Sequence, residues 1–574
     1  MYFQIKKINF PVCILLLLSF IVGLVTINYG LPYSLHPDES YIIKDPLKNI
    51  LNYSHFEFTN TMSLFNWCLL IWYGLVFLFG LLFHQWLNFT EFKNLIIIES
   101  GTIYFYGRLL SVIMITVAHY VIYRLLSKLS NRKHLTAITL IPFIFNPVLL
   151  ASVYWVKFDV ATYLASCILL NLLLEYFVLG NSDIRGKIYY LSIAFISIRI
   201  EIICFLVSLL VFDYLRSKSA SKPFYDKFFV RSVLAGILLY ACITFYPITV
   251  LYKTFHSCDG DAVLATEKTF ETAIGSGVIA QINSGKFLSI FTDNLKFYLT
   301  LSSLSMLPAF LITLLLLHKF IRNKIGYALE SGRTLFLYFY MFLFLVVLLL
   351  FPYHATHYFL SIVTIMLLIT SVCVLTMTNV GARNLFLGIN LAYIVTLSAE
   401  FLMAANLKPD TRFLATAYIL SKTNIHDLIA VETMSMDGYH PLLNESAKVL
   451  RDKSEAVKKI MKGTGLQYEL RAKMNIQDSR NILDIFSVNY LNNNDWINDY
   501  DLNNFKSKHP EYYATTYDMK TRDANMRVAK FYDYIAANYI QDTTFQLTHF
   551  DYRLKFLLST EPYFKNVYFY HVRL

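Results

Sequence analysis

Charged residues are scarce in this chain. Asp, Glu, Lys and Arg together make up 16% of the 574 residues, whereas hydrophobic residues make up 56%. The apolar residues form runs of about twenty, which is the length that a helix needs to cross roughly 30 Å of hydrocarbon. This composition excludes a single water-soluble globule and predicts a multi-pass α-helical membrane protein.

Cysteine is also used sparingly, with seven residues in the chain. Six of them lie in apolar runs, where a thiol behaves as a small hydrophobic group, and only Cys258 lies in a polar loop. The sequence therefore offers neither a disulfide framework nor a CxxC metal site. We expect no redox chemistry.

Three further features are missing. No small-residue cleavage site follows the first apolar run, residues 10–27, so we interpret that run as a retained span. No internal repeat or low-complexity linker divides the chain. No basic cluster interleaved with aromatic residues occurs in the polar tail, so the net charge of +11 does not indicate a nucleic-acid partner. Most of the positive excess lies in residues 1–403, as expected for basic cytoplasmic loops.

Basic residues set the predicted topology. Lys6 and Lys7 place the N-terminus in the cytoplasm, and the cluster from Arg124 to Lys133 marks the cytoplasmic end of a later span. Counting from these points gives about eleven crossings, with residues 189–215 counted as two, formed by residues 10–27, 104–126, 135–155, 159–179, 189–215, 232–252, 297–317, 334–351, 358–377 and 385–403. We expect a transmembrane domain at 1–404 in the plasma (inner) membrane, with outer loops at 29–63 and 253–296, and an extracytoplasmic domain at 405–574.

Two apolar segments do not fit a simple crossing. Residues 64–83 are long enough to span, but a crossing there would put the basic cluster on the wrong side. We therefore expect this segment to lie along the outer face or to re-enter it. Residues 189–215 are flanked by basic loops on both sides, which two short helices meeting near Arg199 would satisfy.

The tail has a different composition, with roughly a quarter of its residues charged. Amphipathic stretches at 411–420 and 448–461 predict helices. Strand-like runs at 428–431, 546–550 and 566–571 predict a small sheet. We expect the tail to fold as a small α/β domain.

Paired carboxylates follow the first predicted span. The loop reads His36-Pro37-Asp38-Glu39. Because proline fixes its own φ angle and lacks an N–H donor, such a turn can hold Asp38 rigidly at the bilayer surface. The simpler interpretation of this pair is a solvated loop in which Asp38 caps a helix.

Other ionisable residues fall at the predicted membrane boundary, where they are costly unless paired or solvated. They are Arg108, Asp159, Arg199 and Glu201. One outer cavity could collect all of them, and the two guanidinium groups would then suit a phosphate, since their planar fork can bind two oxygens at once. The structural alternatives are a snorkelling Arg108 and an ion pair of Arg199 with Glu201 or Asp213.

The order of these motifs resembles that of the GT-C glycosyltransferases of family 39, relatives of the protein O-mannosyltransferases and the lipid A aminoarabinose transferases. The resemblance covers residues 1 to about 440 and rests on the loop at 36–39 followed by Tyr106-Gly107-Arg108-Leu109-Leu110-Ser111-Val112, Phe145-Asn146-Pro147, Val153-Tyr154-Trp155-Val156-Lys157-Phe158-Asp159-Val160, Ile198-Arg199-Ile200-Glu201, Phe351-Pro352-Tyr353-His354-Ala355-Thr356-His357-Tyr358 and Asp410-Thr411-Arg412-Phe413-Leu414-Ala415. Arg199 stands where many members have lysine, and His357 stands where arginine is common.

The resemblance implies an integral-membrane glycosyltransferase. Such an enzyme moves a sugar from a polyprenyl-phosphate donor to a lipid, glycan or protein acceptor on the extracytoplasmic face, with inversion. The implied catalytic residues are Asp38 as the general base, Glu39 and Asp159, and Arg108 and Arg199 would bind the donor phosphate. The candidate substrate contacts are His36, Lys157, His357 and Tyr358. The carboxylates have no fixed spacing and specify no metal, so a divalent cation stays an open alternative.

A membrane transporter or a lipid or glycan flippase is the alternative from another class, because it also places charges within the membrane. The chain lacks paired hydrophobic halves and carries carboxylates in an outer loop, which favours the transferase. A glycan polymerase or ligase would be a membrane transferase without need of the loop at 36–39.

Overall fold

The computed structural model describes most of the helical part and the centre of the tail. The described residues are 10–28, 31, 39, 42–43, 45–47, 63–98, 101–130, 132–153, 156–177, 180–219, 227–244, 287–322, 332–350, 359–407, 411–431, 447–448, 450–451, 454–455, 466–473, 481–484, 502–515, 526–545 and 567–573. The sites predicted at His36, Asp38, His357 and Tyr358 lie outside these residues, as do the strand predicted at 546–550 and most of the loops predicted at 29–63 and 253–296.

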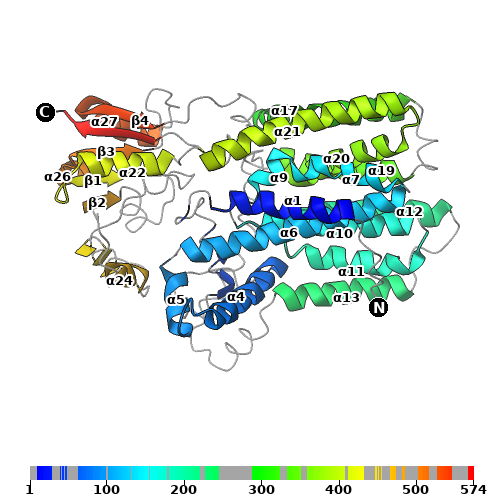
Figure 1. Cartoon of the computed structure of the whole chain (residues 1–574), viewed down its shortest axis with the longest axis horizontal. Coiled ribbons are helices and arrows are strands. Elements are labelled where there is room, and N and C mark those ends of the chain that lie inside the picture. The colour runs from blue at the N-terminus through cyan, green and yellow to red at the C-terminus, as the bar shows by residue number, and fades with distance from the viewer. Residues whose placement is uncertain are drawn as a thin grey trace.

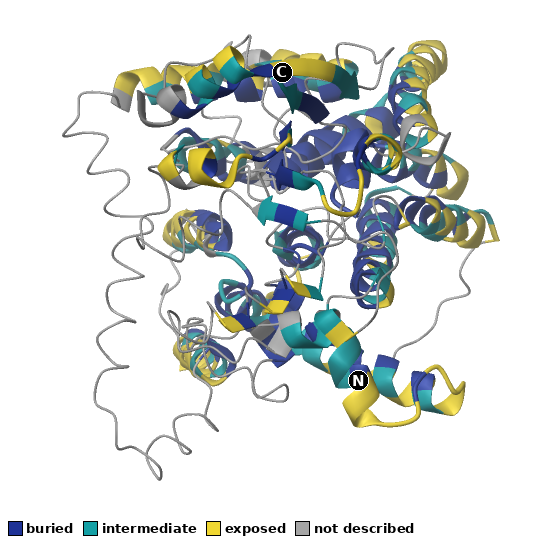
Figure 2. Cartoon of the chain, turned by 90° about the vertical axis from the view of Figure 1, so that its left-hand side faces the viewer, coloured by how far each residue is buried: buried dark blue, intermediate teal, exposed yellow. Residues whose placement is uncertain are grey.

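The first part of the chain is a bundle in which most of the long helices run along one common direction (Figure 1). Their bounds are α1 (Phe10–Thr26), α4 (Leu64–Leu82), α5 (Phe89–Ile97), α6 (Gly101–Leu129), α7 (Lys133–Ile138), α8 (Ile141–Ile144), α9 (Pro147–Ala151), α10 (Phe158–Phe177), α11 (Arg185–Phe195), α12 (Ile203–Ser219), α13 (Lys227–Thr244), α17 (Phe287–Arg322), α19 (Gly332–Leu350), α20 (Leu360–Thr376) and α21 (Val380–Leu407), with 3-10 turns η1 (Asp45–Leu47), η2 (Ser182–Ile184) and η3 (Ile200–Ile202). Buried residues face the interior of the bundle and exposed ones its outside (Figure 2).

The bundle is that of a helical membrane protein. Among the described residues, six helices are long and apolar enough to cross a membrane, namely α4, α6, α10, α13, α17 and α21. Shorter apolar helices are Phe10–Thr26, Lys133–Ile144, Tyr338–Leu349 and Leu360–Thr376. Many outward side chains are large and apolar, as hydrocarbon requires. The predicted number of crossings stays a prediction.

Proline divides two of the predicted spans. Residues 135–155 form three short helices, because Pro142 and Pro147 occupy the first turns of α8 and α9 and cannot continue a preceding helix. Pro308 lies inside α17, where a proline leaves the carbonyl four residues earlier without its helical partner. That carbonyl, on Leu304, accepts a hydrogen bond from the Tyr393 hydroxyl of α21 at 2.6 Å.

The segment at 189–215 is a helical hairpin. α11 and α12 are separated by η3, so Arg199 lies at the hairpin tip. At the base, Asp213 of α12 accepts hydrogen bonds from Arg185 Nε (2.7 Å) and Tyr189 Oη (3.0 Å) of α11. Tyr176 of α10 donates to the same carboxylate at 2.5 Å. The start of α11 and the end of α12 therefore lie together at one end of the bundle, and the two helices join near Arg199. This confirms the prediction of two short helices that meet near Arg199.

The two ends of the bundle differ. We call the end that holds Lys128, Arg185 and Arg216 the basic end; there Lys128 of α6 also pairs with Glu175 of α10. We call the opposite end, formed by the starts of α6 and α10 and the hairpin tip, the tail end, because it faces the sheet of the tail (Figure 1).

The described strands lie after residue 427 and form one five-stranded sheet of order β2-β1-β3-β5-β4. The strands are β1 (Leu428–Val431), β2 (Asn481–Asp484), β3 (Tyr512–Thr515), β4 (Tyr539–Phe545) and β5 (Val567–Val572). β1 is parallel to β2 and β3, whereas β5 is antiparallel to β3 and β4. The strands predicted at 428–431 and 566–571 are confirmed.

Helices cover both faces of this sheet, because side chains alternate along each strand. On one face Ile429 and Val431 pack with Ile419 of α22 (Thr411–Lys422), the helix predicted at 411–420. On the other face Ala430 packs with Phe505 of α26 (Leu502–Lys508) and with α27 (Met526–Asn538). A further short helix, α24 (Leu466–Lys473), contacts α5 of the bundle.

Candidate functional site

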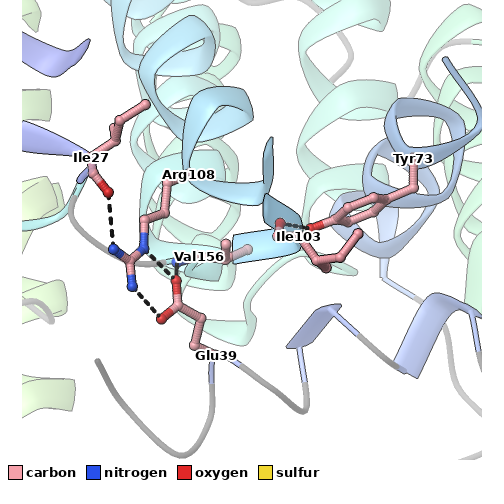
Figure 3. A network of polar contacts seen from close by, with 6 residues as sticks. All are labelled: Ile27, Glu39, Tyr73, Ile103, Arg108 and Val156. Atoms are coloured by element: carbon pink, nitrogen blue, oxygen red, sulfur yellow. Dashed lines mark hydrogen bonds and ion pairs between the residues drawn. The ribbon is translucent and has the colours of Figure 1, made fainter. Parts of the chain in front are cut away.

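A buried ion pair joins the segment after α1 to α6. Arg108 donates from Nε to Glu39 Oε1 at 2.8 Å and from Nη2 to Glu39 Oε2 at 3.0 Å. Both side chains are fully buried. The third guanidinium nitrogen, Nη1, donates to the carbonyl of Ile27 at 3.0 Å, and the N–H of Val156 donates to Glu39 Oε1 at 3.2 Å (Figure 3). This bidentate pair ties the ends of α1 and α6 to the loop at residue 39 and to the segment before α10.

Gly107 makes this close packing possible. A Cβ atom at position 107 would lie 2.6 Å from Val156 Cγ2 and 2.8 Å from the Tyr73 hydroxyl. Tyr73 of α4 in turn donates to the carbonyl of Ile103, one turn earlier in α6, at 2.9 Å (Figure 3). The Gly-Arg sequence therefore has a physical reason. Without a side chain at position 107, Val156 and Tyr73 can pack closely against α6, and Arg108 can then reach Glu39.

A second cluster lies at the tip of the α11–α12 hairpin. Arg199 Nε pairs with Glu201 Oε1 at 2.9 Å, and Arg199 Nη1 contacts Asp159 Oδ1. The two carboxylate side chains are each 6% exposed, whereas the Arg199 side chain is 20% exposed. Asp159 lies in the first turn of α10, where the positive end of the helix dipole favours a carboxylate. Glu201 Oε2 is buried without a hydrogen-bond partner.

One short segment connects the two clusters. Val156 belongs to the first and Asp159 to the second, and Lys157 between them is also buried. Three acidic and three basic side chains thus gather at the tail end, contributed by the loop at residue 39, by α6, by residues 157–159 and by the hairpin tip. Opposite charges balance within this set, which lowers the cost of burying them.

The predicted site residues fall into two groups. Glu39, Arg108, Lys157, Asp159 and Arg199 all lie at the tail end and belong to these clusters or to the segment between them. The predicted roles of the other four positions, His36, Asp38, His357 and Tyr358, stay predictions because those residues are outside the described part of the chain.

The sequence suggested the Arg199–Glu201 ion pair as a structural alternative but gave no indication of the Glu39–Arg108 pair. Residues 69 positions apart give no local pattern that would reveal it. One property of the sequence did point to such a pair: burying an arginine within an apolar helix costs free energy unless a carboxylate or another acceptor lies beside it. The supporting contacts of Gly107 and Tyr73 depend on helix packing and had no signal in the sequence.

The clusters hold carboxylates but define no metal centre. Within the described residues, no group of three or more His, Cys, Asp or Glu side chains could hold a metal ion. Chemically, the arrangement provides fixed carboxylates that can accept hydrogen bonds and one partly exposed guanidinium that can meet an anion.

A comparison of the sequence with protein-family models and with curated proteins gives no match.

Proposed function

We propose that this protein is an integral-membrane glycosyltransferase that moves a sugar from a polyprenyl-phosphate donor to a lipid, glycan or protein acceptor, with inversion. The observation that carries the proposal is the convergence of Glu39, Arg108, Asp159, Arg199 and Glu201 at one end of an apolar bundle. Ionisable groups within membrane helices are expensive to keep and mark functional sites more often than structural ones.

A lipid-linked sugar phosphate suits this location. Its isoprenoid chain belongs in hydrocarbon, and its phosphate and sugar belong at the boundary where the charged side chains lie. Breaking the glycosidic bond increases the negative charge on the departing phosphate, so a guanidinium placed there lowers the barrier. Arg199 is the best-placed candidate because its side chain is more exposed than those of its two carboxylate partners.

Arg108 has a different role in this proposal. The sequence suggests a phosphate contact for it, and that role stays a prediction. Its bidentate pair with Glu39 and its contact with Ile27 support a positioning role instead. Asp38, the proposed base, precedes Glu39 in the chain, and consecutive Cα atoms are about 3.8 Å apart. The anchored neighbour Glu39 therefore supports the proposal that Asp38 acts at these clusters.

The orientation follows from charge. The basic end carries Lys128, Arg185 and Arg216, so the positive-inside rule supports a cytoplasmic location for it. The tail end, with the clusters and the sheet, is then extracytoplasmic. We place the protein in the plasma (inner) membrane on the basis of its proposed donor.

Substitution of Asp38 tests this function. Asp38→Asn should reduce sugar transfer by ~10² or more without loss of folding, because the amide is nearly isosteric but cannot accept the proton of the acceptor hydroxyl. Glu39→Gln should reduce transfer less if Glu39 only supports the site. The readout is mass spectrometry of lipid-linked sugars and surface glycans from cells with and without each variant.

Normal turnover in purified, reconstituted Asp38→Asn protein would remove Asp38 as the base. A transporter or flippase would give another result: the lipid-linked sugar would change sides of the membrane with its glycosidic bond intact.

A further inference from the structure

Helix α4 has two different faces. One face packs against the protein through Phe65, Leu69, Tyr73, Val76 and Gly80, which recur every three or four positions, and Asn66 is buried beside Phe65. The opposite stripe is formed by large apolar side chains that are 43–68% exposed: Ile71, Leu75, Leu78, Phe79 and Leu82. A helix surface of this composition is not stable in contact with water, so something apolar must cover it.

The exposed apolar surface continues past the end of α4. Phe83 is 69% exposed and Leu87 is 78% exposed in the turn before α5, and Phe89 is exposed at the start of α5. Polar residues His84 and Gln85 lie between them and are exposed too. Aromatic and aliphatic side chains mixed with polar ones are typical of a membrane interface.

Contacts at its beginning hold α4 at the tail end. The N–H of Leu64 donates to Ser197 Oγ, at the hairpin tip, at 3.3 Å. Trp67 Nε1 donates to the carbonyl of Ile243, in the last turn of α13, at 3.1 Å. α13 lies beside α11, and both helices begin at the basic end (Figure 1). The last turn of α13 therefore lies away from the basic end.

Contacts at the middle of α4 and just beyond its last residue hold this helix at the tail end as well. Trp72 Nε1 donates to the carbonyl of Tyr106, in the second turn of α6, at 2.8 Å. The Tyr106 hydroxyl donates to Gln85 Oε1, beyond the end of α4, at 2.8 Å. A helix that crossed the membrane would carry one of its ends to the basic end, and neither end of α4 is there.

We propose that α4 and α5 form a wedge in the outer leaflet that does not cross the membrane, and that leaflet lipid covers the stripe from Ile71 to Leu82 together with Phe83, Leu87 and Phe89. Lipid is the favoured occupant because α4 contacts α13, whose exposed apolar residues Leu234, Ile237 and Leu238 continue the same kind of surface.

The wedge also forms the lipid-facing wall of the Glu39–Arg108 cluster. Tyr73 on its inner face packs over Gly107, next to Arg108, while Leu75 and Leu78 face outward. A lipid in the outer leaflet would thus be separated from the buried ion pair by the thickness of one helix.

Spin labels test the position of the wedge without any substrate, so the result is independent of the proposed enzymatic activity. In full-length protein with the seven native cysteines replaced, single cysteines are introduced as Leu82→Cys and Leu87→Cys and labelled in phosphatidylcholine and phosphatidylglycerol vesicles. Both replaced side chains are exposed, so folding should be unaffected. Leu238→Cys on α13 is the lipid control, and Lys508→Cys in the tail is the water control.

We expect accessibility to oxygen and to a water-soluble nickel chelate to place labels 82 and 87 about 5–10 Å below the phosphates, like an interfacial helix. Thr61→Cys, before α4, and Thr90→Cys, in α5, should both react with an impermeant thiol reagent from the same side as Lys508→Cys. Reaction of positions 61 and 90 from opposite sides would overturn the wedge in favour of a crossing. Water-like accessibility at 82 and 87, or spin–spin broadening between copies, would show that lipid is not the occupant.

Discussion

Breaking the Glu39–Arg108 pair from one side should cost more free energy of unfolding than removing both charges together. Arg108→Ala leaves the fully buried Glu39 carboxylate without its guanidinium partner, although the Val156 N–H still donates to it, and it also removes the Arg108 donor from the Ile27 carbonyl. Removing one partner of a buried ion pair typically destabilises a protein by ~3–5 kcal/mol. We expect a loss of this size for Arg108→Ala.

The double variant Glu39→Gln with Arg108→Met should lose less. It places no unpaired charge in the interior, nearly conserves volume, and keeps a side-chain oxygen for the Val156 N–H. Two uncharged groups lose by this change: the Ile27 carbonyl loses its Arg108 donor, and the new amide N–H groups at position 39 have only a methionine beside them at position 108. A buried uncharged group without its partner costs about 1–3 kcal/mol, which is less than the cost of an unpaired buried charge. The double variant should therefore be more stable than Arg108→Ala.

Equilibrium unfolding in mixed micelles, followed by circular dichroism, measures these free energies. Arg124→Ala is the matched control, because Arg124 lies on the same helix with an exposed side chain, and exposed substitutions usually change stability by less than about 0.5 kcal/mol. If Arg108→Ala unfolds like Arg124→Ala, or if the double variant is less stable than Arg108→Ala, the assignment of this pair as a buried anchor is wrong.

Three further variants test other parts of the structure. Gly107→Ala should lose ~1–3 kcal/mol of stability in the same unfolding assay, since its methyl group would overlap Val156 and Tyr73; unchanged stability would contradict the tight packing. Asp213→Ala should destabilise by ~3–5 kcal/mol, because it leaves Arg185 without its buried carboxylate; wild-type unfolding would show that this carboxylate does not hold the hairpin together. Arg199→Ala should lower both donor affinity and single-turnover rate, with lysine falling short of arginine by ~1–2 kcal/mol; normal values for both in folded Arg199→Ala would remove Arg199 from the site.

The hairpin of α11 and α12 could be predicted because charge alone specifies it. Arg185 and Arg216 flank a stretch too long for one short helix and too polar in the middle for an ordinary span, and the positive-inside rule returns both ends to one side. β1 and α22 were similarly predictable, since strand and helix periodicities are local properties of the sequence.

The partners of the charged residues were harder to predict. A sequence shows that Arg108 needs a hydrogen-bonding partner, but whether that partner is a substrate phosphate, a lipid headgroup or Glu39 depends on how α1, α6 and the segment at residue 39 pack. The breaks between α7, α8 and α9 were a different failure: Pro142 and Pro147 were visible, but the continuous apolar run favoured a single span.

Cleavage of a lipid-linked sugar is the activity on which the proposed function depends, and one measurement addresses it directly. The purified protein is reconstituted in nanodiscs with the polyprenyl-phosphate sugars extracted from cells that produce it and with their acceptor fraction, and mass spectrometry follows free polyprenyl phosphate over time. We predict release of polyprenyl phosphate by the wild-type protein and a decrease of ~10² or more in Asp38→Asn. Donor lipids that stay intact with folded wild-type protein, across all the extracted species, would contradict a glycosyltransferase.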